Sequence, residues 1–254
     1  MKILSIGNSF SQDAQRWLHD IAMSDGVELD CVNLVIGGCS LERHYNNLIS
    51  GVEEYGYELN AVNIKNTSLS DGLKAEKWDI ITLQQVSQLS GKSETYFPYI
   101  EKLSEYIREC CPQAKLYIHK TWAYEIDSTH DGFMLYGRDQ NVMYNEICRS
   151  YAEVAEKICA DGIIPTGEVV QYMRENVPEF DYKNGGLSLN RDGFHLSLDY
   201  GRLAAGLCWY NTLLGGDILH NSFVPEIDGV RADESLVYKV RSAVKNALES
   251  IYEQ

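Results

Sequence analysis

The chain has 254 residues and a net charge of -15, with 22 Lys and Arg against 37 Asp and Glu. This length suits a single α/β domain over residues 1–254, and the acidic charge disfavours nucleic acid or an anionic membrane as a partner. We find no apolar run long enough to span a membrane and no evident signal peptide, which predicts a cytoplasmic protein.

Hydrophobic periodicity predicts strands that alternate with helices along the chain. The expected strands are an apolar run ended by Gly7, then Val27–Ile36, Trp78–Gln85, Lys115–Thr121 and Gly162–Ile164. The expected helices are Asp13–Ser24, Ser40–Ser50, Glu94–Cys111, Asp139–Ala160, Thr166–Asn176, a leucine-rich segment ended by Gly215, and Glu234–Tyr252. Residues 53–70 alternate as in a hairpin at the periphery of the sheet. This order predicts an α/β fold, a three-layer α/β/α sandwich with a mostly parallel central sheet.

Ser9 lies in the sequence Gly-Asn-Ser-Phe-Ser, just after the first predicted strand and before a helix for which Ser11 and Asp13 are suitable caps. Open α/β sheets bind ligands at that edge, and the start of a helix suits an oxygen that becomes negative during acyl transfer. A Gly-Asn-Ser segment is also ordinary turn chemistry. Ser9 is therefore a candidate nucleophile that needs support from other parts of the chain.

Asp192-Gly-Phe-His195 is the second candidate. A carboxylate three residues before an imidazole can accept its Nδ1 proton and leave Nε2 as a general base, provided that Gly193 makes the turn. The alternative is that Asp192 only caps a turn beside a surface histidine. The other histidines and the seven cysteines have no metal-like spacing, so no metal site is expected.

Further candidates follow the other predicted strands. Gly38 ends the second strand, where a glycine N–H can approach a bound group, although a plain turn is the alternative. Gln84, Gln85, Ser87 and Gln88 lie at the end of the third strand, and a side-chain amide there can donate to an oxyanion. The loop after the fourth strand contains Trp122 and Tyr124, whose rings form either a substrate wall or a cap on the core.

Taken together, Ser9, Gly38, the amide after the third strand and Asp192-x-x-His195 resemble the four blocks of the SGNH, or GDSL-like, hydrolases. The resemblance covers nearly the whole chain. It is closest to a little-characterised branch with the blocks Gly-Asn-Ser-Phe-Ser, Trp-Asp-x-x-x-Leu-Gln-Gln-x-Ser and Asp-x-Phe-His-Leu-Ser. Two departures are Asn8 in place of the common Asp and the lack of Gly-x-Asn-Asp in the third block.

The resemblance implies a flavodoxin-like topology and serine-dependent ester hydrolysis. Ser9 would be the nucleophile, His195 the base and Asp192 its orienting partner. Three groups would hold the oxyanion: the N–H of Ser9, the N–H of Gly38, and an amide for which Gln85 is favoured ahead of Gln84 and Gln88. No metal or organic cofactor would be required.

We therefore expect a hydrolase that acts on a small acyl ester, an acetyl group on a carbohydrate. An acidic protein suits a neutral substrate, and Trp122 and Tyr124 could stack on a sugar ring. The main alternative is a catalytically silent carbohydrate-binding or scaffold protein of the same fold. Two others are a flavodoxin-like phosphate or nucleotide binder that uses residues 7–11, and a cysteine hydrolase that uses Cys39.

Overall fold

The computed structural model describes residues 1–252, and the contacts within it define two compact units. Unit 1 comprises residues 1–12, 29–121 and 145–163, and unit 2 comprises residues 13–28, 122–144 and the chain from Ile164 onward. The two units are described in turn. The organisation of residues 1–254 as a single domain stays a prediction.

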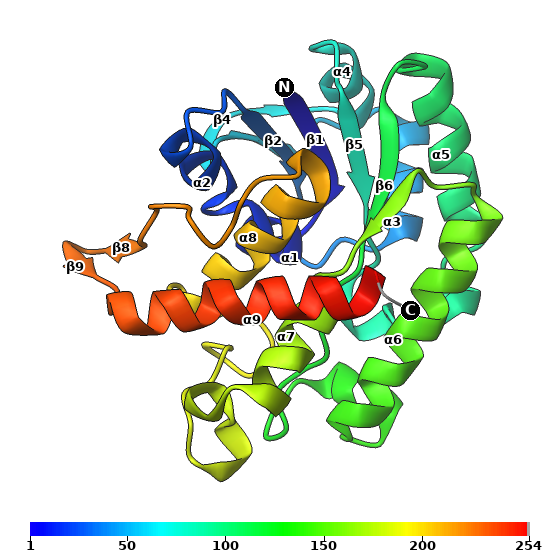
Figure 1. The fold of residues 1–254 in the computed structure, drawn as a ribbon. Helices are drawn as coiled ribbons and strands as arrows, with labels where there is room; N and C mark the ends of the chain where they lie inside the picture. Colours follow the sequence, from blue (N-terminus) through cyan, green and yellow to red (C-terminus); the bar gives the residue numbers. More distant parts are fainter. Residues whose placement is uncertain (253–254) are drawn as a thin grey trace. The chain divides into compact units, whose positions relative to one another are not determined.

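Unit 1 is built on a seven-stranded sheet with the order β4-β3-β2-β1-β5-β6-β7. The strands are β1 (Lys2–Gly7), β2 (Asp30–Val35), β3 (Tyr55–Leu59), β4 (Val62–Thr67), β5 (Ile80–Leu83), β6 (Lys115–His119) and β7 (Gly162–Ile164). Strands β2, β1, β5 and β6 run parallel, whereas β3 and β4 form an antiparallel hairpin at one edge (Figure 1). The apolar side chains of β1 are fully buried, as expected for a central parallel strand.

Helices accompany the sheet of unit 1. They are α3 (Leu41–Ser50), α4 (Leu69–Lys74), α5 (Tyr99–Cys110) and most of α6 (Gln140–Lys157). The first three pack against one another, and α4 also approaches the sheet closely: a Cβ atom on Gly72 would lie 2.5 Å from Leu34 Cδ1. Helix α3 has the expected ends, because Ser40 Oγ accepts from the Arg43 N–H and Gly51 adopts a left-handed conformation.

Unit 2 is largely helical and contains α2 (Leu18–Ser24), α7 (Thr166–Asn176), α8 (Tyr200–Leu214) and α9 (Glu234–Tyr252). Helix α8 packs against the other three (Figure 1). Its first eleven residues are buried except Arg202, and Gly206 allows a close approach to α2, since a Cβ there would lie 2.8 Å from Ile21 Cδ1. A short hairpin of β8 (Glu226–Ile227) and β9 (Val230–Arg231) lies between α8 and α9 in the chain.

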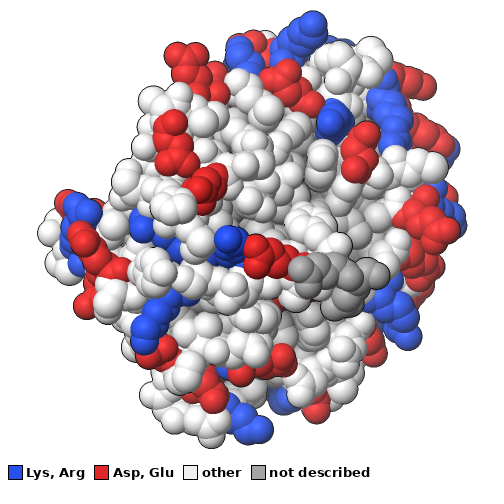
Figure 2. Space-filling model, viewed as in Figure 1, with Lys and Arg blue, Asp and Glu red and all other residues white. Residues whose placement is uncertain are grey.

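The expected α/β class with a mostly parallel central sheet flanked by helices is confirmed. The starts of two helices were wrong by four or five residues: α1 (Ser9–Gln15) begins four residues before Asp13 and is separated from α2, and α5 begins at Tyr99, five residues after Glu94. Among the described residues, no helix is long and apolar enough to cross a membrane. On the face shown in Figure 2, the described Lys and Arg side chains are scattered among Asp and Glu, which agrees with the acidic composition.

Candidate active site

Asn8 starts the helix that carries Ser9. Its side-chain Oδ1 accepts from the Phe10 N–H at 3.0 Å, and its carbonyl oxygen accepts from the Gln12 N–H at 3.1 Å. Asn8 is therefore the N-cap of α1, and the expected capping residues Ser11 and Asp13 lie inside the helix. Ser9 is the first helical residue, and it is half-buried.

Gly7 lets the first turn of α1 fold closely over the end of β1. A Cβ atom at this position would lie 2.3 Å from Ser11 Oγ, a separation that no side chain tolerates. Ser11 Oγ is itself within hydrogen-bond distance of the Asn8 carbonyl oxygen, at 2.8 Å, and of Asn33 Oδ1, at 2.9 Å. The close packing at Gly7 and the hydrogen-bond contacts of Ser11 therefore hold the turn that precedes Ser9 in place.

A buried hydrogen-bond network joins the carboxyl ends of the central strands. Asn8 Nδ2 donates to the Cys39 carbonyl at 3.0 Å, and Gln84 Nε2 donates to Asn8 Oδ1 at 2.8 Å. Gln84 Oε1 lies 2.6 Å from His119 Nδ1, which carries the proton because an amide oxygen only accepts. Burial lowers the pKa of His119 to about 3, so the ring is neutral. Asp in place of Asn8 could not donate to Cys39, which explains this departure from the common motif.

Gly38 occupies an exposed turn after β2. The turn is closed by a hydrogen bond from the Cys39 N–H to the Ile36 carbonyl at 3.1 Å, and Gly38 has a φ of 62°, a left-handed conformation that favours glycine. Through Cys39, the bond from Asn8 ties this turn to the start of α1, where Ser9 lies. Two of the three expected oxyanion donors therefore lie on segments that a hydrogen bond links to each other.

The side chain of Gln85, the third expected oxyanion donor, makes hydrogen bonds to other groups of the protein. Its Oε1 accepts from the N–H groups of Leu41 and Val86, at 3.0 and 2.9 Å, and its Nε2 donates to the carbonyl and hydroxyl oxygens of Thr95. Both N–H groups of the amide are thus used, and the structure does not support Gln85 as an oxyanion donor. Gln84 and Ser87 are also buried, whereas Gln88 is half-buried. Gln88 therefore becomes the preferred side-chain amide to donate to an oxyanion.

The change of the preferred oxyanion donor from Gln85 to Gln88 gives a testable contrast. We expect Gln85→Ala to lower the free energy of unfolding by about 1–3 kcal/mol, because buried N–H groups lose their acceptor, and to leave kcat nearly unchanged. Gln88→Ala should leave the free energy of unfolding nearly unchanged and lower kcat by about 10²- to 10³-fold. Thermal unfolding and kcat on a nitrophenyl acetate measure both effects. A loss of kcat in Gln85→Ala at unchanged stability would restore the original assignment.

Asp192 and His195 form the expected pair within unit 2. Asp192 Oδ2 lies 2.7 Å from His195 Nδ1, and Oδ1 accepts from the backbone N–H groups of His195 at 2.8 Å and Phe194 at 3.2 Å. Partial burial would raise the pKa of Asp192, but the hydrogen bonds from His195 and Phe194 outweigh it and hold the pKa below its usual range. The ionised carboxylate can only accept, so Nδ1 donates to it, and in this tautomer Nε2 carries the lone pair that a general base uses.

A family model described as "Domain of unknown function (DUF4886)" matches residues 2–245. The chain belongs to this DUF4886 family. A crystal structure of a DUF4886 family protein from Bacteroides uniformis is 33% identical, covers 98% of this chain and 94% of its own, and has a TM-score of 0.88. No curated protein matches the chain.

Two further solved structures show which fold the DUF4886 chain has. A candidate SGNH hydrolase from Slackia heliotrinireducens is 22% identical, with a TM-score of 0.57, over 84% of this chain and 98% of its own. A candidate GDSL-like lipase from Parabacteroides merdae is 13% identical, with a TM-score of 0.54, over 83% of this chain and 94% of its own. The DUF4886 chain therefore has the fold of the SGNH-like superfamily.

The aromatic residues expected to stack on a substrate lie inside the DUF4886 protein. Trp122 and Tyr124 are both 0% exposed, so neither ring is available to a sugar and this expectation is wrong. Trp122 Nε1 instead donates to the Phe194 carbonyl at 2.7 Å, and the Tyr124 ring packs 5.7 Å from the Phe194 ring. Sequence reasoning missed this role. The two rings support the turn between Asp192 and His195.

Cys39 has a histidine partner that sequence reasoning did not find. Its Sγ lies 3.4 Å from His44 Nδ1, which is also 2.9 Å from the Tyr55 hydroxyl. Burial raises the pKa of Cys39 to about 12 and lowers the pKa of His44 to about 3. A thiolate and an imidazolium therefore do not form near neutral pH, and the cysteine-hydrolase alternative loses its chemistry. In the part of the chain that the structure describes, no cluster of side chains is placed to hold a metal ion.

Proposed function

We propose that this DUF4886 protein is a serine hydrolase that cleaves a small acyl ester through an acyl-enzyme on Ser9. The observation that carries the proposal is the Asp192–His195 pair, with a carboxylate held ionised 2.7 Å from Nδ1. The chain also connects this pair with the nucleophile. Ser9 begins α1, and Asp13, one turn later on the same helix, accepts from the N–H of Leu196, the residue after His195.

In the proposed reaction, His195 Nε2 takes the proton of the Ser9 hydroxyl while Oγ attacks the ester carbonyl. The N–H groups of Ser9 and Gly38 and the amide of Gln88 stabilise the oxyanion. The bond to the alcohol then breaks, and His195 returns the proton to the leaving oxygen. Water, activated by His195 in the same way, cleaves the acyl-enzyme and releases the acid.

For the substrate we propose an acetyl ester of a carbohydrate. The net charge of -15 favours a neutral substrate over an anionic one. With Trp122 and Tyr124 buried, support for a sugar comes from polar groups instead of aromatic rings. A hollow of about 300 Å³ reaches Asp192 and Gly193 and is lined by hydroxyl, amide and carboxylate side chains that can hydrogen-bond sugar hydroxyls, among them Ser128, Ser188 and Asn190.

A fluorophosphonate probe tests the proposal directly. Ser9 Oγ should attack phosphorus and displace fluoride, so mass spectrometry should find one adduct, on the peptide that contains Ser9. Acetylated xylo-oligosaccharides should release acetate with a higher kcat/KM than matched butyrate esters. A protein that neither reacts with the probe nor releases acetate would support the alternative, a catalytically silent carbohydrate-binding or scaffold protein.

A further inference from the structure

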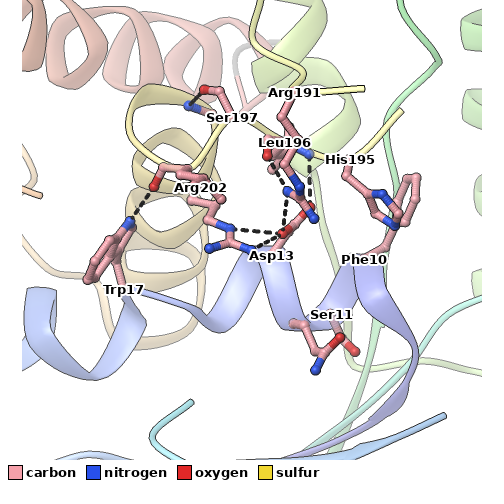
Figure 3. Close-up of polar contacts among 12 residues, drawn as sticks. Phe10, Ser11, Asp13, Trp17, Arg191, His195, Leu196, Ser197 and Arg202 are labelled. Atoms are coloured by element: carbon pink, nitrogen blue, oxygen red, sulfur yellow. Dashed lines mark hydrogen bonds and ion pairs between the residues drawn. The ribbon is translucent and has the colours of Figure 1, made fainter. Parts of the chain in front are cut away.

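Asp13 is a buried carboxylate with an unusual number of donors. It is 0% exposed, and an unpaired charge in that position would be strongly destabilising. Arg191 Nη1 lies 3.0 Å from both carboxylate oxygens, and Arg202 Nε lies 2.8 Å from Oδ1. The backbone N–H of Leu196 donates to Oδ2 at 2.8 Å (Figure 3). The Asp13 carboxylate therefore accepts hydrogen bonds from two guanidinium groups and a main-chain N–H.

The partners of Asp13 stand on both sides of the Asp192–His195 pair. Arg191 directly precedes Asp192, and Leu196 directly follows His195. The two flanks also bond to each other, because the Arg191 N–H donates to the His195 carbonyl at 2.9 Å and the Arg191 side chain donates to the Leu196 carbonyl. An antiparallel bridge between Asn190 and Leu196 closes the same loop. Asp13 thus holds both ends of the loop at once.

Stability alone would not call for this arrangement. A buried ion pair contributes little net stability compared with apolar side chains of the same volume, and in some proteins its role is to specify one geometry. The geometry fixed here is the main chain on either side of His195. Arg202, near the start of α8, adds a third attachment, so that a helix backs the carboxylate as well.

We infer that Asp13 is a positioning residue that sets the direction of the His195 imidazole by anchoring the loop from Arg191 to Leu196. The inference rests on the proposed function, in which His195 is the base. Asp13 follows Ser9 by one turn of α1, so the helix that begins with the nucleophile also supplies the anchor for the base. A displacement of about 1 Å in such a group can cost about 10²-fold in rate without any contact to the substrate.

Asp13→Asn tests the inference because it keeps the shape and removes the charge. At a temperature well below unfolding, we expect kcat to fall by about 10²-fold, KM to stay within about threefold, and the rate of fluorophosphonate labelling to fall with kcat. Asp217→Asn is the matched control. Asp217 makes the same contact with His220, at 2.6 Å, on an exposed surface, and its loss should leave kcat unchanged.

Two measurements separate positioning from stability. In the double variant Asp13→Asn/Asp192→Asn, the loss of kcat should be smaller than the product of the single losses, because both residues act through His195. If Asp13→Asn does not fold, Arg191→Lys replaces it, since Arg191 is partly exposed; we expect a loss of about tenfold. A kcat per folded molecule within about threefold of wild type in Asp13→Asn, or in Arg191→Lys where it replaces Asp13→Asn, would overturn the inference. Absence of labelling and hydrolysis in the wild-type protein would instead overturn the proposed function.

Discussion

Ser9→Ala is expected to reduce the hydrolysis of short acyl nitrophenyl esters by about 10⁴- to 10⁶-fold and to abolish fluorophosphonate labelling. The hydroxyl is the proposed nucleophile, and no group in an alanine can replace it. The first position of a helix tolerates alanine well, so the melting temperature should hardly change. Initial rates over a range of substrate concentrations, together with a thermal unfolding curve, measure both quantities.

Ser11→Ala is the matched control for this experiment. Ser11 lies two residues further along α1, and its buried hydroxyl contacts Asn8 and Asn33. Its removal should lower the free energy of unfolding by about 1–3 kcal/mol and leave kcat of the folded protein far above that of Ser9→Ala, because the nucleophile is still present. Full activity in Ser9→Ala would end the serine-nucleophile hypothesis, whatever Ser11→Ala does.

Asp192→Asn is expected to lower kcat/KM by about 10⁴-fold, because the His195 ring is no longer held in the productive tautomer. The pKa of Asp192 lies below its usual range, so the wild-type carboxylate is ionised throughout the neutral range and the loss should persist across it. Measurements of kcat/KM at several pH values from about 5 to 9 would show this.

The lowered pKa of Asp192 sets the sign of the companion stability effect. Because the folded pKa lies below the unfolded value, Asp192 contributes stability above its unfolded pKa, and this contribution is lost as pH falls through the folded pKa. Asp192 is therefore ionised across the range of the assay. If Asp192 only capped the turn, Asp192→Asn would lower the free energy of unfolding by about 1 kcal/mol and leave kcat/KM unchanged. That result would remove Asp192 from the mechanism.

Much of the fold could be predicted because its elements have strong local patterns. The segments at Gly162–Ile164 and Thr166–Asn176 match β7 and α7 at both ends, and the alternating residues 53–70 contain the expected edge hairpin of β3 and β4. The start of α1 was misplaced because Asn8 was taken as part of a turn. Helix α4 was missed because its six residues are too few to show a helical period.

The site was harder to predict where it depends on burial. Asp192 and His195 meet because three residues and a glycine turn suffice, but Asp217 and His220 make the same contact at the surface, so spacing alone does not identify an active site. Burial of Trp122 and the bonds of Gln85 depend on segments far apart in the chain, and no local pattern reports them. The role of Asp13 likewise requires Arg191 and Arg202, which lie more than 170 residues away.

The network through Asn8 has a consequence for how this scaffold can be redesigned. Because Asn8 joins the turns after β1 and β2 and also Gln84 after β5, a substitution in one of these turns disturbs the other two. Substitutions in these turns are therefore a poor way to obtain new substrate preferences. The loop between Ile126 and Asp139 has mostly exposed side chains. A mutant library for altered selectivity would best vary that loop and leave the strand ends untouched.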